Sequence, residues 1–181
     1  MKNIPIYTIG YGNRSIDIFI ALLKQHAIEY LVDVRSQPYS RAHPEFSKAR
    51  LEQLLKERQI HYVFMGDTLG GRPQDETCYV EGRVDYSRVR TKPFFQDGIQ
   101  RLHTAWEKQL AVAIMCAELK PQECHRGKLI SSILLEQGIT VVHIVEDGTL
   151  KTQEEIYQFA TDTQLSLFDD VLKFSRKKYH V

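Results

Sequence analysis

The sequence predicts a three-layer α/β fold, Rossmann-like or flavodoxin-like, with a mainly parallel sheet of about five strands and helices on both faces. Three observations predict this fold. Short runs rich in β-branched and aromatic residues alternate with amphipathic stretches of helical length, which is typical of parallel strands joined by crossover helices. The most apolar run, residues 110–119, is typical of a strand buried on both faces. The length of 181 residues fits one domain with a sizeable hydrophobic core.

The predicted strands and helices alternate along the chain. The strands are residues 5–12, 29–36, 60–66, 110–119 and 139–145. The helices are residues 16–26, 48–58, 94–108, 124–137 and 153–160. Ser15 and Ser47 stand at the N-cap positions of the first two helices, and Gly138 follows the fourth at the position where a helix commonly ends.

Between the third strand and the third helix, residues 67–90 are polar and show no convincing period, which predicts a long functional loop or a partly ordered insertion. No linker divides the chain. We therefore expect one α/β domain over residues 1–150, followed by a C-terminal helix and tail over residues 151–181. The basic run at 176–178 is typical of a solvated tail.

The composition excludes several classes of protein. A net charge of +1 gives no overall field that would attract nucleic acid or an anionic membrane. No apolar run approaches the length of about 20 residues that a transmembrane helix needs, and the opening residues lack the apolar region of a signal peptide. Three cysteines give no disulfide framework, so we expect a cytoplasmic protein that does not bind membranes.

Chemically active residues follow the predicted strands, and the carboxyl ends of parallel strands are where α/β sheets bind ligands. These residues are Gly10, Tyr11 and Asn13 after the first strand, Asp33, Arg35, Ser40 and Arg41 after the second, Gly70 and Gly71 after the third, and Glu118, His125 and Arg126 after the fourth. We therefore expect the functional site at this edge of the sheet.

The cysteines near this edge raise two alternatives. Cys116, Cys124 and His125 form the pattern Cys-x7-Cys-His, which is not a usual zinc spacing, and adjacent Cys124 and His125 are poorly placed to bind one ion tetrahedrally. We therefore expect no metal and no cofactor. Cys124 at a helix start beside a histidine and an arginine has the surroundings of a nucleophile. A packing role is the favoured interpretation for both cysteines.

An anion pocket explains the charged residues better. The first turn of a helix offers unpaired N–H groups, and Arg126 in that turn adds a guanidinium that can bind a phosphate oxygen pair. Arg35 and Arg41 could close the pocket. Glu118, Asp33 and His125 are the candidate general acids and bases. The alternative is structural: Arg126 pairs with Asp33 or Glu118, and the carboxylates only orient the arginines.

These residues resemble the DUF488 family of uncharacterised microbial proteins. The resemblance runs from about residue 6 to residue 148 and rests on "YTIGYGNRS", "LVDVRSQPYSR", Phe46, "LGGRP" and "MCAELKPQECHR". It implies an α/β fold of Rossmann-like type and no established activity. The recurrent positions of the family fall here on Gly10, Asp33, Arg35, Pro38, Ser40, Gly70, Gly71, Cys116, Glu118, Cys124, His125 and Arg126.

A second motif lies beyond this resemblance, in "TQLSLFDD" at residues 163–170. It is similar to the short peptide by which bacterial replication and repair proteins dock on the DNA sliding clamp. In that interpretation Leu165, Leu167 and Phe168 fill apolar pockets and Gln164 is hydrogen-bonded. In the alternative interpretation the segment packs on the protein's own core.

The sequence therefore supports two hypotheses about function. The favoured one is an enzyme, a hydrolase or transferase, that binds a phosphorylated or nucleotide-like substrate and uses carboxylate and histidine chemistry. The other is a non-catalytic module that associates with nucleic acid or repair proteins by docking on the sliding clamp.

Overall fold

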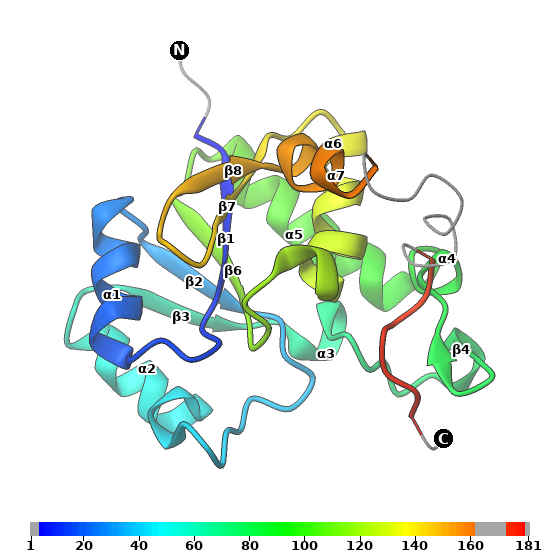
Figure 1. Ribbon diagram of the computed structural model, residues 1–181, viewed down its shortest axis with the longest axis horizontal. Coiled ribbons are helices and arrows are strands. Elements are labelled where there is room, and N and C mark those ends of the chain that lie inside the picture. The colour runs from blue at the N-terminus through cyan, green and yellow to red at the C-terminus, as the bar shows by residue number, and fades with distance from the viewer. Residues whose placement is uncertain (1–3, 162–172, 180–181) are drawn as a thin grey trace.

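A computed structural model describes residues 4–161 and 173–179. Its centre is a six-stranded sheet in the order β3-β2-β6-β1-β7-β8 (Figure 1). The strands are β1 (Ile6–Gly10), β2 (Tyr30–Asp33), β3 (His61–Phe64), β6 (Val112–Cys116), β7 (Val141–Ile144) and β8 (Leu150–Thr152). All neighbouring strands pair in parallel except β7 and β8. The predicted three-layer α/β fold is confirmed, with one strand more than the expected five.

The additional strand, β8, runs antiparallel to β7 at the edge of the sheet. It follows a tight turn in which Gly148 has a φ of 82° and the amide of Val145 donates to the carbonyl of Thr149. Three residues are too few to show the alternation of a strand, so the sequence pattern did not reveal it.

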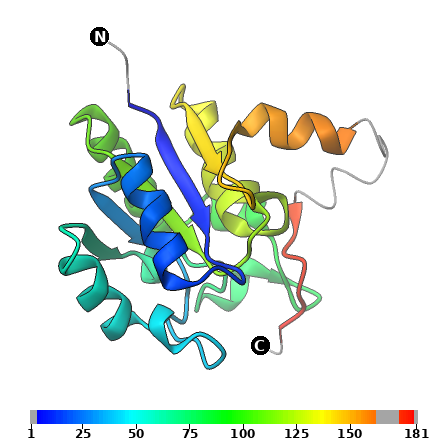
Figure 2. The same cartoon turned by 60° about the vertical axis from the view of Figure 1, so that its left-hand side comes forward.

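Helices cover both faces of the sheet (Figures 1 and 2). One face carries α1 (Ile16–Gln25) and α2 (Lys48–Lys56), which bury Phe19 and Leu51 in a core shared with Ile9 of β1. The opposite face carries α5 (Pro93–Glu107) and α6 (Ser132–Glu136), which bury their apolar side chains against Ile114 of β6. Successive residues of the strands therefore serve two separate cores, as the period of a strand requires.

The two predicted N-caps behave differently. The Ser15 side chain accepts a hydrogen bond from the amide of Ile18, so it caps α1 as expected. Ser47 precedes α2 but makes no capping bond. Its hydroxyl exchanges hydrogen bonds with the backbone of Ser40, which fastens the loop after β2 to the start of α2.

Residues 67–90, predicted as a long functional loop or a partly ordered insertion, contain several short elements. The segment from residue 66 to residue 89 contains α3 (Gly66–Leu69), the 3-10 turn η2 (Glu76–Cys78), a hairpin of β4 (Tyr79–Val80) and β5 (Arg83–Val84), and α4 (Tyr86–Val89). Asp75 and Asp85 start two of these elements by accepting hydrogen bonds from amides two residues later. Elements of two to four residues are too short to give a period.

The helix predicted over residues 124–137 is divided. A 3-10 turn, η3 (Pro121–Glu123), is followed by a π-helical segment, η4 (Arg126–Ser131), and then by α6. The end is as predicted, because Gly138 has a φ of 78°, a conformation that glycine adopts without strain. Short π-helical segments often occur at functional sites.

Residues 173–179 follow the helix α7 (Gln153–Thr161) and return to the hairpin of β4 and β5 (Figure 1). The amide of Ser175 donates to the carbonyl of Val84, and the amide of Val84 donates to the Ser175 hydroxyl. The amide of Tyr179 donates to the carbonyl of Gly82. The basic side chains at 176–178 are exposed, as expected of a solvated tail, but their backbone is held on the domain.

A series of buried polar side chains, which we call the polar chain, runs from η4 through the core to α7. The guanidinium Nε of Arg126 donates to the Thr8 hydroxyl, which lies 2.7 Å from Nδ1 of His143. Nε2 of His143 lies 2.6 Å from Oε1 of Gln153, so the ring donates there and accepts from Thr8. Each of these four side chains is at least 97% buried.

The order of the strands creates a crevice at the carboxyl ends of β1, β6 and β2. The chain leaves β1 and β2 toward the face of α1 and α2, whereas it leaves β6 toward the face of η4 and α6. Neighbouring strands whose connections depart to opposite faces leave a gap between them, and α/β proteins bind ligands in such gaps. Among the described residues, no helix is long and apolar enough to cross a membrane.

Candidate functional site

A cavity of about 220 Å³ lies at this crevice. Its walls come from the ends of β1, β2 and β6, from the start of η4, and from the C-terminal segment 173–179. The lining residues are Tyr11, Arg35, Ser36, Gln37, Tyr39, Gly71, Arg72, Tyr86, Cys116, Ala117, Glu118, Glu123, Cys124, His125, Ser175, Arg176, Lys177 and Tyr179. The expected edge of the sheet therefore does contain a cavity.

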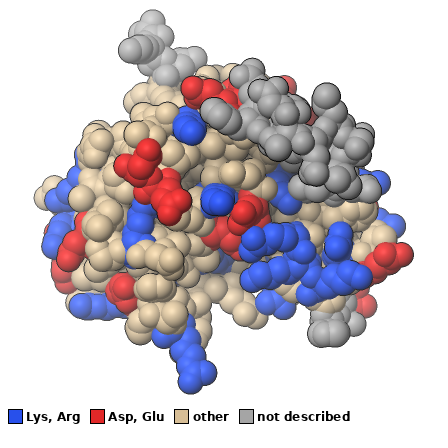
Figure 3. Space-filling model, viewed as in Figure 1, with Lys and Arg blue, Asp and Glu red and all other residues tan. Residues whose placement is uncertain are grey.

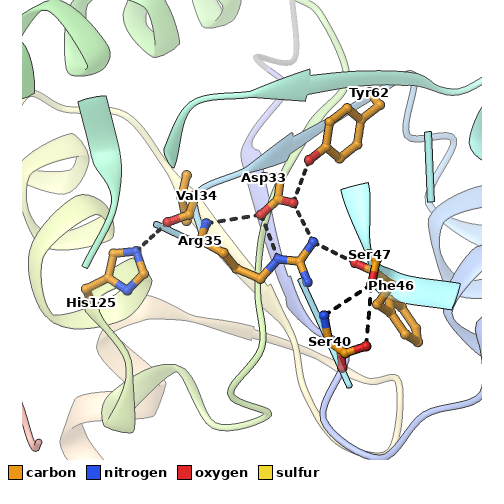
Figure 4. Close-up of polar contacts among 8 residues, drawn as sticks. All are labelled: Asp33, Val34, Arg35, Ser40, Phe46, Ser47, Tyr62 and His125. Carbon is orange, nitrogen blue, oxygen red and sulfur yellow. Dashed lines mark hydrogen bonds and ion pairs between the residues drawn. The ribbon is translucent and has the colours of Figure 1, made fainter. Parts of the chain in front are cut away.

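Asp33 and Arg35 form a buried ion pair beneath this cavity (Figure 4). The Arg35 guanidinium donates through Nε to Oδ1 at 2.9 Å and through Nη2 to Oδ2 at 2.6 Å. Tyr62 donates its hydroxyl proton to the same carboxylate at 2.7 Å. Asp33 is fully buried and is not among the lining residues, so it orients Arg35 and is not placed to contact a ligand.

Arg35 lines the cavity and keeps one nitrogen without a partner. Its side chain is 5% exposed, and Nη2 also donates to the carbonyl of Phe46 at 2.8 Å. Nη1 is buried and has no hydrogen-bond partner. Burial alone would lower the pKa of Arg35, but the Asp33 carboxylate outweighs burial and raises that pKa. The result is a fixed positive charge in the wall of the cavity, with one buried donor that is unused.

His125 stands opposite, between β2 and the two cysteines. Its Nε2 lies 3.0 Å from the carbonyl of Val34, which fixes the ring (Figure 4). Its Nδ1 faces the sulfur of Cys124 at 3.6 Å and the sulfur of Cys116 at 3.9 Å. The Cys116 thiol in turn donates to Oε2 of Glu118 at 2.8 Å. Glu118 lies two residues past the end of β6, which ends at Cys116, three residues before the predicted end of this strand.

The charges in this cluster are linked. Burial favours a neutral Cys124, but the neighbouring Cys116 side chain, His125 and Arg126 outweigh burial and hold the pKa of Cys124 well below its ordinary value. The interaction with Cys124, followed by burial, raises the pKa of Cys116 well above its ordinary value. Burial lowers the pKa of His125, and the Cys124 charge reverses this and raises it. A thiolate next to an imidazolium can attack an electrophile or accept a cation in place of the protons.

Three glycines allow close approaches of the chain around the site. A Cβ at Gly10 would lie 1.9 Å from the carbonyl oxygen of Glu118, and a Cβ at Gly71 would lie 2.6 Å from Nδ1 of His125. At Gly70, a Cβ would meet the carbonyl of Gly66 at 2.2 Å. The sequence places these glycines at the predicted ligand-binding edge of the sheet. In the structure each of them lets a neighbouring part of the chain come close.

Arg126 does not reach the cavity. It is fully buried, and its terminal nitrogens donate to the carbonyls of Glu118 and Leu119. The sequence analysis left open an anion-binding role or an ion pair with Asp33 or Glu118. The contacts are instead with backbone, because the turn after β6 presents two carbonyls that no strand partner satisfies. Arg126 therefore shapes the turn that carries Glu118.

Five other predicted ligand residues also lie outside the cavity lining: Gly10, Asn13, Ser40, Arg41 and Gly70. Arg41 and Asn13 are exposed on loops, and the Ser40 hydroxyl accepts from the amide of His43. Those predicted residues that the structure does bring together at the cavity are Tyr11, Arg35, Gly71, Glu118 and His125. Gln164, Leu165, Leu167 and Phe168, predicted to dock on the sliding clamp, lie outside the described residues.

Several lining residues were missed by the sequence analysis. Arg72 stacks on the ring of Tyr179 with its guanidinium carbon 4.4 Å from the ring centre. Arg176 pairs with Glu123 at 2.8 Å, and Lys177 lies next to it on the same wall. Figure 3 shows the Lys and Arg side chains gathered where the C-terminal segment runs. The basic run 176–178 was the available signal, but only the pairing with β5 assigns it to the site.

Comparison with known proteins identifies the family of this chain. A family model described as "Domain of unknown function DUF488" matches residues 15–133, which is more than half of the chain and includes Arg35, Glu118 and His125. No curated protein and no solved structure matches the chain. The chain belongs to the DUF488 family.

Proposed function

We propose that this protein is an enzyme that acts on a small phosphorylated or nucleotide-like substrate, bound as an anion in the cavity at the carboxyl ends of β1, β2 and β6. The unpartnered Nη1 of Arg35 carries the proposal. A buried donor without a partner costs free energy, commonly about 1–3 kcal/mol. A phosphate oxygen bound at Nη1 would remove this cost and would gain a charge-assisted hydrogen bond.

The charge of the lining supports an anionic ligand. Its cationic side chains are Arg35, Arg72, Arg176 and Lys177, and its carboxylates are Glu118 and Glu123. Arg176 neutralises Glu123, and Asp33 neutralises Arg35 from outside the lining. Arg72 and Lys177 then contribute positive charge that Glu118 only partly balances. Such an excess in a concave site raises the local concentration of anions.

The size and the aromatic residues narrow the class of substrate. A volume of about 220 Å³ lies below the roughly 300–1,000 Å³ of pockets for drug-sized ligands. It fits a phosphate with a small attached group. Tyr39 is 72% exposed at the rim and offers a ring face on which a sugar or base outside the cavity can stack.

Glu118 is the general base that this arrangement favours. Its carboxylate lines the cavity and is half-buried, whereas Asp33 is enclosed by Arg35 and Tyr62. His125 is held by Val34 on one side and faces sulfur on the other, so it is placed to support the charge of the cluster. The reaction class that fits is hydrolysis or transfer of a group, with Glu118 taking a proton from the nucleophile.

Binding of phosphate compounds tests the anion site. We expect isothermal titration calorimetry to detect binding of inorganic phosphate, a sugar phosphate or a nucleoside monophosphate, and no binding of the unphosphorylated nucleoside. Arg35→Lys should weaken phosphate binding at least about tenfold, because a lysine has a single side-chain nitrogen and Asp33 would occupy it. Arg58→Lys is the matched control, since Arg58 also pairs with a nearby carboxylate but is 44% exposed on the surface.

Arg72→Gln provides a second variant in case Arg35→Lys disturbs the fold. It removes a rim charge without touching the buried ion pair, and it should also weaken phosphate binding. If none of the phosphate compounds binds the folded wild-type protein, the proposal is wrong.

Turnover tests the role of Glu118. Once a phosphate compound that binds has been identified, product formation should fall at least about 100-fold in Glu118→Gln, because glutamine cannot accept the proton. Binding of the same compound, measured by calorimetry, should change little. Glu123→Gln is the control, because Glu123 also lines the cavity but is paired with Arg176. Equal turnover in wild type and Glu118→Gln would exclude Glu118 as the base.

A further inference from the structure

We infer that Cys116, Cys124 and His125 form a zinc site with one coordination position open to the cavity. The sulfur atoms of the two cysteines and a ring nitrogen of His125 all lie within 4.8 Å of one another. The three residues are at least 92% buried, and all three line the cavity. Two thiolates and one imidazole are ligands that zinc prefers.

The distances match the edges of a coordination tetrahedron. Zinc binds sulfur at about 2.3 Å and histidine nitrogen at about 2.0–2.1 Å, so a sulfur and a nitrogen on one tetrahedral ion are about 3.5 Å apart. Nδ1 of His125 lies 3.6 Å from the Cys124 sulfur and 3.9 Å from the Cys116 sulfur. The two sulfur atoms lie within 4.8 Å of one another, where one tetrahedral ion needs about 3.8 Å, so rotation of the cysteine side chains brings all three ligands to bonding distance.

The backbone explains how two adjacent residues can share an ion. Cys124 is extended, with φ −128° and ψ 148°, whereas His125 is helical, with φ −59° and ψ −25°. This change of conformation turns two neighbouring side chains toward one point. The sequence predicts one helix that contains both residues, and neighbouring side chains of a regular helix point in different directions. The structure differs from that expectation at Cys124.

The surroundings also suit a metal ligand set. Histidines that bind metals generally use the other ring nitrogen for a hydrogen bond that fixes the ring, and Nε2 of His125 lies 3.0 Å from the carbonyl of Val34. The amide of Arg126 points at the Cys124 sulfur at 3.5 Å. Such N–H contacts stabilise a thiolate ligand.

The fourth position faces the cavity next to Glu118. Its carboxylate lies 2.8 Å from the Cys116 sulfur but is not one of the three converging ligands. Three protein ligands with an open fourth position are typical of catalytic zinc, whereas structural zinc has four protein ligands. A water on the ion would lie within reach of the Glu118 carboxylate. The zinc site does not depend on the proposed anion site at Arg35.

Metal content and cobalt spectroscopy test this site on the full chain. Protein produced with added zinc and purified without chelator should contain about one zinc per chain by mass spectrometry of the metal. After removal of zinc by a chelator, Co²⁺ should produce the visible bands of tetrahedral cobalt and a sulfur-to-cobalt charge-transfer band. Cys116→Ser and Cys124→Ser should each bind zinc more than about 100-fold more weakly, since loss of even an outer partner costs 10–100-fold.

The third cysteine of the chain provides the matched control. Cys78 is also buried but does not belong to the converging group, so Cys78→Ser should keep the full zinc content and the cobalt spectrum. Wild-type protein without zinc and without a cobalt–thiolate band would overturn the inference, whatever the folding of the variants. Unchanged zinc content in both Cys116→Ser and Cys124→Ser would also overturn it. If the protein binds phosphate but no zinc, the zinc site is wrong and the anion site at Arg35 still holds.

Discussion

Replacing Arg126 with methionine should lower the free energy of unfolding by about 3–5 kcal/mol, because the carbonyls of Glu118 and Leu119 would lose their donors inside the protein. Methionine fills a similar volume, so the loss reports the missing hydrogen bonds and charge more than a cavity. The guanidinium also donates to the Thr8 hydroxyl. The expected loss is therefore larger than that of an ordinary surface substitution.

Urea denaturation, followed by the fluorescence of Trp106, measures this change. Arg101→Met is the matched control, because Arg101 is exposed on α5, and its replacement should change stability by less than about 0.5 kcal/mol. A loss below about 1 kcal/mol in Arg126→Met would show that water satisfies the two carbonyls, and that Arg126 does not hold the turn after β6.

The second large effect is a loss of folding stability at low pH. His143 is fully buried in the polar chain, and burial, with a contribution from the Arg126 charge, lowers its pKa to about 4. In the unfolded chain the pKa of a histidine is about 6.5, so between these values the unfolded state binds a proton that the folded state rejects. The stability of the fold with a neutral His143 is fully present above about pH 6.5 and is lost as the pH falls toward 4. The difference in pKa corresponds to about 3 kcal/mol over that interval.

Urea denaturation at a series of pH values between 7 and 4 tests this expectation. His143→Asn should remove most of this pH-dependent loss, because asparagine does not titrate, although it lowers stability at every pH. His61→Asn should leave the pH dependence unchanged, because His61 is exposed on β3 and is solvated before and after unfolding. A wild-type and a His143→Asn protein with the same pH dependence would show that groups other than His143 cause the acid sensitivity.

The elements with a clear period were predictable. Residues 110–119 had the apolar run of a central strand, and β6 does lie between β1 and β2 with every residue buried. The regions that failed lack any period at all. The β4–β5 hairpin has two residues in each strand, so its contacts with Ser175 and Tyr179, distant in sequence, define it more than its own composition.

The position of the candidate site was also predictable from the sequence, but the roles of its residues were not. Arg35 and Arg126 are both arginines after buried strands, yet only Arg35 lines the cavity. What separates them is the partner within reach: the Asp33 carboxylate leaves Nη1 of Arg35 unused, whereas two carbonyls occupy Arg126. Such three-dimensional details of the backbone leave no trace in the spacing of residues.

Because the C-terminal segment lines the cavity, the cavity can form only late in protein synthesis. The ribosome makes Cys116, Glu118 and His125 before it makes residues 173–179, which form the last wall. Until Ser175 pairs with Val84 and Arg72 stacks on Tyr179, the nascent chain lacks this wall of the cavity. A chain whose translation stops before residue 173 never gains it.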